Sequence, residues 1–152
     1  MNTHRRLLVM AAGLSPLAPW SAAIAKPLRI EVWKSATCGC CKDWIAYLEK
    51  DGFQVISHDT GNAAVRARMG LPNRYGSCHT AVIDGYLVEG HVPAREIRRL
   101  LRERPAALGI AVPEMPIGSP GMDGPAYGNR REPYAVLLVA RDGSATVYQQ
   151  YD

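Results

Sequence analysis

Residues 28–52, LRIEVWKSATCGCCKDWIAYLEKDG, decide the fold because they predict a strand, a cysteine-bearing loop and a helix in direct succession. Apolar and polar residues alternate from Leu28, as they do in a half-buried strand. The apolar residues of DWIAYL then recur at helical spacing, and Gly52 is a typical helix stop. We therefore expect the helix to begin near the cysteines, where the positive end of its dipole favours thiolate over thiol.

The segments after residue 52 continue the alternation of strands and helices. FQVISHD predicts a second strand, NAAVRARMG a short helix that ends at Gly70, and HTAVIDGYLVEG a hairpin with Asp84 and Gly85 in its turn. PAREIRRLLRER predicts a helix with Pro93 near its first turn. The order strand, helix, strand, helix, strand, strand, helix is that of the thioredoxin fold.

The composition changes after Pro105. The segment PAALGIAVPEMPIGSPGMDGPAYGNRREP is dense in proline and glycine and has no sustained period, which predicts a long loop draped over the domain. YAVLLVARDGSATVYQQY then predicts a closing hairpin with Asp142 and Gly143 in its turn. The predicted fold is therefore α/β: a thioredoxin-like domain with a long Pro/Gly-rich loop and an added C-terminal β-hairpin.

The first 25 residues have the pattern of a secretory signal peptide. MNTHRR is a positive n-region, a short apolar stretch interrupted by glycine and proline follows, and AIA ends at Ala25 as a cleavage motif. A membrane anchor is the alternative, but the apolar run is shorter than the roughly 20 residues that span a bilayer. We expect residues 1–25 to be removed on export to the periplasm, by either translocation route. Residues 26–152 then form one domain with no stable membrane insertion.

Charge gives no indication of a nucleic-acid partner. The formal net charge of +4 falls to +2 when Arg5 and Arg6 leave with the first 25 residues. The basic residues of REIRRLLRER alternate with Glu96 and Glu103, which is typical of a solvated helix face.

The four cysteines are the main indication of chemistry. Cys38, Cys40 and Cys41 lie within four positions, which argues against simple disulfide staples, and a bond between the neighbours Cys40 and Cys41 would be strained. Cys38 and Cys41 have the C-x-x-C spacing of a redox dithiol, but such a dithiol does not need the third cysteine, Cys40. In a thioredoxin-like layout the SCHT segment faces this loop, and it carries Cys78 where thioredoxins have a cis proline. The fold is therefore expected to bring Cys78 to the other three sulfurs.

Four convergent thiolates can hold zinc, hold Cu(I) or exchange disulfides. Zinc sites normally separate paired ligands by two or more residues, a condition that adjacent Cys40 and Cys41 do not meet. Cu(I) is a soft ion suited to thiolates, and bridging sulfurs let crowded cysteines serve more than one ion. A structural zinc domain is the least favoured, since a domain of this length should fold without metal.

Three segments together resemble the CopG-type copper-resistance family of exported, thioredoxin-like metal-binding proteins. They are TCGCCKDW, GSCHTAVIDGYLVEGHVPAREIRRLL and VPEMPIGSPGMDG, and they occur in the family's order across nearly the whole mature chain. The resemblance implies that Cys38, Cys40, Cys41 and Cys78 bind copper, as a multinuclear Cu(I) thiolate cluster, in periplasmic copper tolerance. Other periplasmic copper-resistance proteins are the implied partners. The resemblance is compatible with three roles: electron transfer, copper storage, or delivery of copper to another protein.

Other residues near these motifs are weaker candidates. His79 neighbours Cys78 and is either a further copper ligand, a hydrogen-bond partner of a sulfur or a histidine satisfied at a strand edge. His91 is interpreted as a turn contact. Met115 and Met122 flank PIGSPG and are interpreted as packing residues, with thioether ligation of Cu(I) as the alternative.

The lysines beside the cysteine motif, Lys34 and Lys42, are interpreted as surface charges. The alternative role is electrostatic stabilisation of an anionic thiolate cluster.

The sequence thus favours a copper-binding protein over an enzyme. The rival function is a thiol-disulfide oxidoreductase in which Cys38 attacks and Cys41 resolves.

Overall fold

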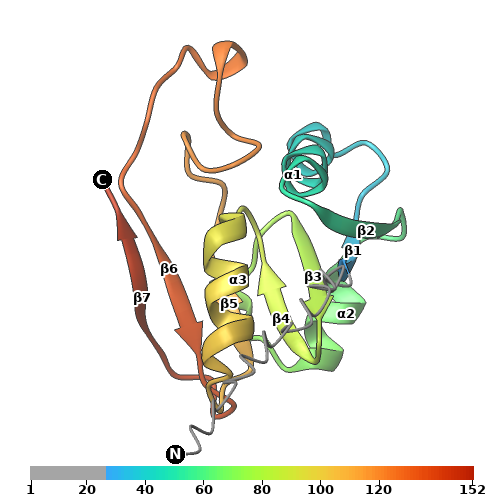
Figure 1. Ribbon diagram of the computed structural model, residues 1–152, viewed down its shortest axis with the longest axis vertical. Coiled ribbons are helices and arrows are strands. Elements are labelled where there is room, and N and C mark those ends of the chain that lie inside the picture. Colours follow the sequence, from blue (N-terminus) through green and yellow to red (C-terminus); the bar gives the residue numbers. More distant parts are fainter. Residues whose placement is uncertain (1–26) are drawn as a thin grey trace, which may run out of the picture.

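The computed structural model describes residues 27–152, and the predicted signal peptide lies outside the described residues. These residues form a mixed α/β fold (Figure 1), built on one sheet of seven strands in the order β2-β1-β3-β4-β5-β6-β7. Within residues 27–152, no helix is both long enough and apolar enough to cross a bilayer. The elements are β1 (Leu28–Lys34), α1 (Gly39–Lys50), β2 (Phe53–His58), α2 (Ala63–Met69), η1 (Asn73–Tyr75), β3 (His79–Ile83), β4 (Tyr86–Glu89), α3 (Ala94–Glu103), β5 (Gly109–Ala111), η2 (Pro125–Tyr127), β6 (Tyr134–Val139) and β7 (Ala145–Tyr151).

The predicted order of elements from β1 to α3 is confirmed. β1 pairs in parallel with β2 and antiparallel with β3, so it is an interior strand, and its buried apolar residues Ile30 and Val32 belong to the main core. The antiparallel register sets Lys34, the last residue of β1, opposite His79, the first residue of β3. The loop that leaves β1 and the segment that enters β3 therefore meet at one edge of the sheet.

The predicted structureless segment from Pro105 is interrupted by a short strand. β5 pairs in parallel with β4 and antiparallel with β6, which joins the C-terminal hairpin to the same sheet. An added Cβ on Gly109 would lie 1.9 Å from the carbonyl oxygen of Leu87, so only glycine permits this pairing. Three buried residues are too few to produce a periodic pattern, which is why the sequence predicted a loop here.

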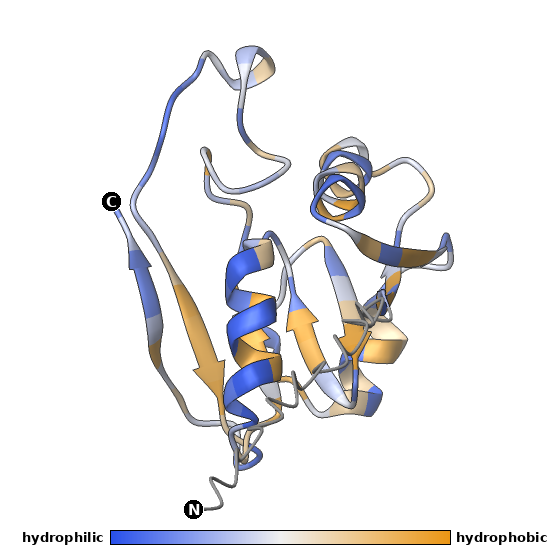
Figure 2. Ribbon diagram, viewed as in Figure 1, coloured by the Kyte–Doolittle hydropathy of each residue, from blue (hydrophilic) through white to orange (hydrophobic). Residues whose placement is uncertain are grey.

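The charged helix α3 packs on the sheet and contacts its last strand, β7. Figure 2 shows its polar side turned outward, while Ile97 and Leu100 are fully buried. The prediction of a solvated basic face is only partly right. Arg99 lies over the ring of Tyr148 at 3.9 Å, and buried Glu96 accepts a 2.9 Å hydrogen bond from the Tyr151 hydroxyl. These contacts secure β7 at the edge of the sheet.

Candidate metal site

Three of the cysteines lie at the beginning of α1. Cys38 is the residue before the helix, and its N–H donates to the Ser35 carbonyl at 3.1 Å, which closes the turn that leaves β1. Cys40 and Cys41 follow within the first turn of the helix. Cys41 is fully buried, and the other two are half-buried. All three sulfurs therefore lie at the positive end of the helix dipole, as the sequence predicted.

Cys78 reaches this cluster from the segment that precedes β3. Its Sγ lies 3.8 Å from that of Cys40 and 3.4 Å from that of Cys41, and the Sγ atoms of Cys38 and Cys40 are 3.6 Å apart. All four Sγ atoms lie within 4.8 Å of one another. The fold thus brings the predicted sulfurs together, while their role as metal ligands stays a prediction.

The C-x-x-C pair is in its oxidised form. Cys38 and Cys41 form a disulfide with their Cα atoms 5.4 Å apart, whereas Cys40 and Cys78 are free thiols. A sulfur that is bonded to another sulfur is not available as a thiolate ligand. A disulfide between these two cysteines therefore excludes their use as thiolate ligands.

Two buried histidines extend the cluster on the side of Cys78. The Sγ of Cys78 lies 3.3 Å from Nδ1 of His79 and 3.1 Å from Nε2 of His91. The three residues form a second group whose donor atoms all lie within 4.8 Å of one another. Both groups contain Cys78, so its sulfur is shared between them.

His91, interpreted from the sequence as a turn contact, lies against the sulfur of Cys78. Its Nδ1 lies 2.9 Å from the carbonyl oxygen of Pro120, and since a carbonyl can only accept, Nδ1 carries the proton. The lone pair of neutral His91 is then on Nε2, which faces Cys78. One signal was present in the sequence: in the hairpin, Gly90 lies opposite His79, so the residue after it lies near the cysteine before His79.

His79 has a nitrogen without a partner. Its Nε2 is buried and has no hydrogen-bond partner among the described residues, and its ring lies 4.3 Å from that of Trp44. Burial lowers the pKa of His79 to about 3, and neighbouring His91 acts in the same direction. Burial also raises the pKa of the Cys78 thiol to about 12, with Cys40 adding to the effect. Without a cation, Cys78 and His79 are thus held neutral, and a bound cation would supply the charge that favours thiolate at Cys78.

The proline- and glycine-rich loop is docked on the site. An added Cβ on Gly121 would lie 2.7 Å from the backbone nitrogen of Trp44 and 2.8 Å from the carbonyl oxygen of Cys40, and its φ of +82° favours glycine. In Figure 1 this orange segment bends toward α1. The loop contributes a fitted backbone here, including the Pro120 carbonyl that orients His91.

The loop methionines differ in their surroundings. Met115 is 47% exposed and lines a surface cavity of about 380 Å³ with Glu132 and Tyr134. Met122 is half-buried, and its N–H donates to the Ser119 carbonyl at 2.8 Å. Neither observation tests thioether ligation, which stays a prediction.

One of the two lysines beside the cysteines is misjudged by the sequence interpretation. Lys34 is buried rather than on the surface, and its ammonium pairs with Asp59, which lowers the pKa of that carboxyl group. Lys42 is exposed, as predicted.

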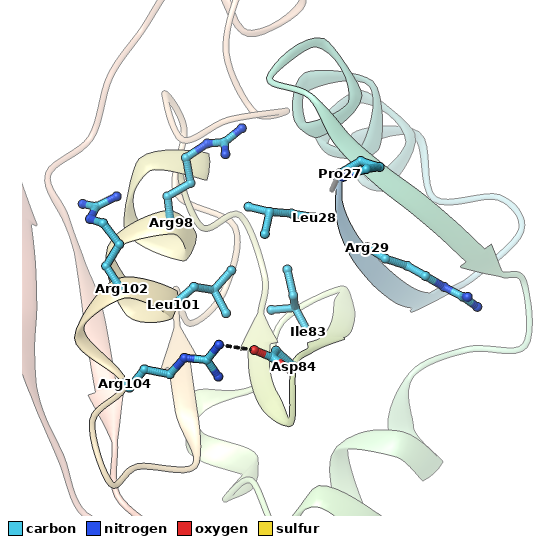
Figure 3. Close-up of a pocket in the computed structure, with 9 residues that line it drawn as sticks. All are labelled: Pro27, Leu28, Arg29, Ile83, Asp84, Arg98, Leu101, Arg102 and Arg104. Carbon is cyan, nitrogen blue, oxygen red and sulfur yellow. Dashed lines mark ion pairs between the residues drawn. The ribbon is translucent and has the colours of Figure 1, made fainter. Parts of the chain in front are cut away.

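A surface cavity of about 620 Å³ lies away from the cysteines (Figure 3). Three of its four arginines already have acidic partners, among them Arg104, which pairs with Asp84 at 2.6 Å. The lining residues include no cysteine or histidine: Pro27, Leu28, Arg29, Ile83, Asp84, Arg98, Leu101, Arg102 and Arg104.

Comparison with known proteins identifies the family. A family model described as a protein of unknown function, DUF411, matches residues 75–122. A solved structure named "Copper resistance protein copG- Form 2" is 51% identical, covers 84% of this chain and 100% of its own, and superposes with a TM-score of 0.77. The chain belongs to the CopG family of copper resistance proteins.

The second CopG structure, Form 1, agrees with the first. It is 51% identical, covers 83% of this chain and 98% of its own, and has a TM-score of 0.76. No curated protein matches the chain. The DUF411 match contains Cys78, His79, His91 and Gly121, so it covers the half of the site that lies outside α1.

Proposed function

We propose that the protein binds copper as Cu(I), in a multinuclear thiolate site formed by Cys38, Cys40, Cys41 and Cys78. The observation that carries the proposal is the convergence of four sulfurs from two distant segments to within 4.8 Å. Membership of a family whose solved relatives are named copper resistance proteins supports copper as the metal. Soft thiolates are the ligands that Cu(I) prefers.

The number of donor atoms favours more than one ion. A single tetrahedral ion would use four donors, whereas four sulfurs and two imidazoles gather here in two overlapping groups. The groups share Cys78, and a shared sulfur is what a bridging thiolate requires. Nδ1 of His79, which lies 3.3 Å from the Sγ of Cys78, and the oriented Nε2 of His91 are available as nitrogen donors. We therefore add His91 to His79 as candidate ligands after the cysteines.

Loading of the full site requires reduction of the disulfide first. Two electrons and two protons, from a dithiol reductant, convert the Cys38–Cys41 disulfide to two thiols, and the reductant leaves as its own disulfide. The thiols then lose their protons as they bind the metal. Before reduction, only Cys40, Cys78 and the histidines are available as ligands.

The second candidate function is thiol-disulfide exchange by Cys38 and Cys41. The disulfide between them at the beginning of a helix favours it, because this is where a helix dipole activates a thiolate. It does not account for Cys40 or for the histidines beside Cys78. We rank it below copper binding for that reason.

The remaining proposals concern architecture and location. A thioredoxin-like core from β1 to α3 is supported by the order of its elements and by the strand order β2-β1-β3-β4. We propose a periplasmic location, with other copper-resistance proteins as sources or acceptors of copper. Export predicts cleavage after Ala25. Intact-mass measurement of the exported protein tests it, and a retained N-terminus with membrane association after a salt wash would refute it.

A metal titration tests the central proposal. The mature protein is reduced with a dithiol, freed of reductant under anaerobic conditions, and titrated separately with Cu(I) and with Zn²⁺ against a strong chelator. We expect more than one Cu(I) per chain. Binding of a single Zn²⁺ in preference to Cu(I) would overturn the copper assignment, and absence of binding of either ion would favour the oxidoreductase.

A further inference from the structure

A buried polar network holds the backbone immediately before Cys78. The N–H of Ser77 donates to Oε1 of Glu89 at 2.7 Å. The carbonyl oxygen of Ser77 accepts two hydrogen bonds, one from Nη1 of Arg66 and one from Nδ2 of Asn62, each at 3.1 Å. Both backbone polar groups of Ser77 are therefore bound by side chains that come from α2, from the residue before α2 and from the end of β4.

The members of the network also bind one another. Arg66 pairs with Glu89 at 3.0 Å, and Glu89 is fully buried. The other carboxylate oxygen of Glu89 accepts a 2.6 Å hydrogen bond from the Thr80 hydroxyl, which itself lies 3.1 Å from Nδ2 of Asn62. An added Cβ on Gly76 would lie 2.4 Å from Nη1 of Arg66, so a side chain there would displace the guanidinium from its present position.

The location of this network determines what it does. Cys78 precedes the first residue of β3, so no ladder hydrogen bond of that strand holds Ser77. The Ser77 carbonyl lies in the peptide plane that leads to the Cα of Cys78, and its two donors fix that plane. A buried ion pair is costly compared with apolar residues of the same size. Here the ion pair fixes the backbone of one segment, and that segment carries the sulfur of Cys78, which the two groups of donors share.

We propose that Asn62, Arg66 and Glu89 are positioning residues for Cys78, which they hold in place by clamping the peptide group of Ser77. The Sγ of Cys78 lies within 3.8 Å of both Cys40 and Cys41. A rotation of the preceding peptide plane would swing it out of the cluster. The clamp does not depend on metal, whereas its consequence for copper rests on the proposed function.

The test compares two cysteines within each molecule. Reduced, metal-free protein is treated briefly with iodoacetamide, and peptide mass spectrometry gives the alkylation rate of Cys78 relative to Cys40. Global unfolding exposes both sulfurs, so the ratio of the two alkylation rates would then be near that of an unfolded chain. Loss of the clamp alone should raise the alkylation rate of Cys78 and leave that of Cys40 unchanged. The variants are Asn62→Ala, which removes one donor without uncovering a charge, Arg66→Met, and Arg66→Lys as the conservative rescue. Arg68→Met is the matched control, because Arg68 is an exposed arginine of the same helix.

We expect Asn62→Ala to raise the ratio about three- to tenfold, the population change for the one hydrogen bond that the Ser77 carbonyl loses. Arg66→Met should raise the ratio further, and Arg66→Lys should give a ratio between those of Arg66→Met and the wild type. Arg68→Met should leave the ratio unchanged. An unchanged ratio in folded Asn62→Ala would overturn the proposal, even if Arg66→Met fails to fold. An equal increase in the alkylation rates of Cys40 and Cys78 would also overturn it.

Titration of the same variants with Cu(I) separates the two proposals. Cu(I) affinity should fall in the order in which the alkylation ratio rises. If the wild-type protein binds no Cu(I), the proposed function is wrong, while the alkylation ratio still decides whether the clamp exists.

Discussion

Replacement of Gly121 by alanine tests whether the proline- and glycine-rich loop is part of the site. Its added Cβ would lie 2.7 Å from the Trp44 nitrogen and 2.8 Å from the Cys40 carbonyl oxygen, and both neighbours are backbone atoms of a helix that cannot move aside. Alanine at the left-handed φ of +82° adds a conformational cost. Left-handed backbone costs about 1 kcal/mol and overpacking about 1–3 kcal/mol, so the total is about 2–4 kcal/mol.

The Gly121→Ala substitution can have either of two measurable effects. If the loop stays docked, the melting temperature should fall by roughly 8–16 °C, at about 4 °C per kcal/mol for a domain of this size. If the loop detaches instead, the melting temperature falls less, but Cys40 loses its cover and reacts faster with iodoacetamide. Circular dichroism gives the melting temperature, and peptide mass spectrometry gives the alkylation rate.

Gly128→Ala is the matched control for this prediction. Gly128 lies in the same loop at a left-handed φ of +65°, but an added Cβ there meets only Cγ of Arg130 at 4.0 Å. It should therefore show the backbone cost of about 1 kcal/mol without the steric one. If Gly121→Ala matched Gly128→Ala in both melting temperature and Cys40 reactivity, the reasoning about loop docking would be refuted.

Three further substitutions probe the proposed copper site. Cys78→Ser should lower the Cu(I) capacity as severely as Cys38→Ser, measured by chelator competition; unchanged capacity in a variant folded by circular dichroism would exclude the four-sulfur site. Cys40→Ser should lower copper per chain and growth under copper stress while leaving any disulfide reductase activity of Cys38 and Cys41 intact, and the reverse pattern would favour the oxidoreductase. His91→Ala should weaken Cu(I) binding roughly ten- to hundredfold, as loss of a ligand or of its supporting group does; equal affinity would return His91 to the role of a turn contact.

The sequence was sufficient for the features that depend on local pattern. The alternation in LRIEVWK and the spacing in DWIAYL predicted β1 and α1, and the cysteines were correctly expected at the beginning of the helix. The approach of Cys78 was also predictable, because the order of elements implies that β3 pairs beside β1. Contacts that follow from topology can be inferred once the topology is right.

Features that depend on long-range packing were not predictable. β5 has three residues, fewer than any periodic signal needs, and its strand character comes from pairing with β4 and β6. The burial of Lys34 depends on Asp59, a partner 25 residues away. His91 owes its orientation to Pro120, which lies 29 residues further along the chain in a segment without pattern. In each case the decisive neighbour comes from another element.

The contacts around the proposed copper site also explain why its residues are held together without a metal ion. Classical zinc fingers lack a core and gain their folding free energy from the metal, so their ligands converge only on binding. Here the main core runs beneath the cysteines, with fully buried Trp44 and Val32 among its members. The donors come from the beginning of α1, from the segment that enters β3 and from His91, two residues after β4, and each is held by a contact that involves no metal. Binding then does not have to offset the entropy of ordering these segments. The disulfide is therefore the one covalent change that separates the structure described here from a site with all four thiols available.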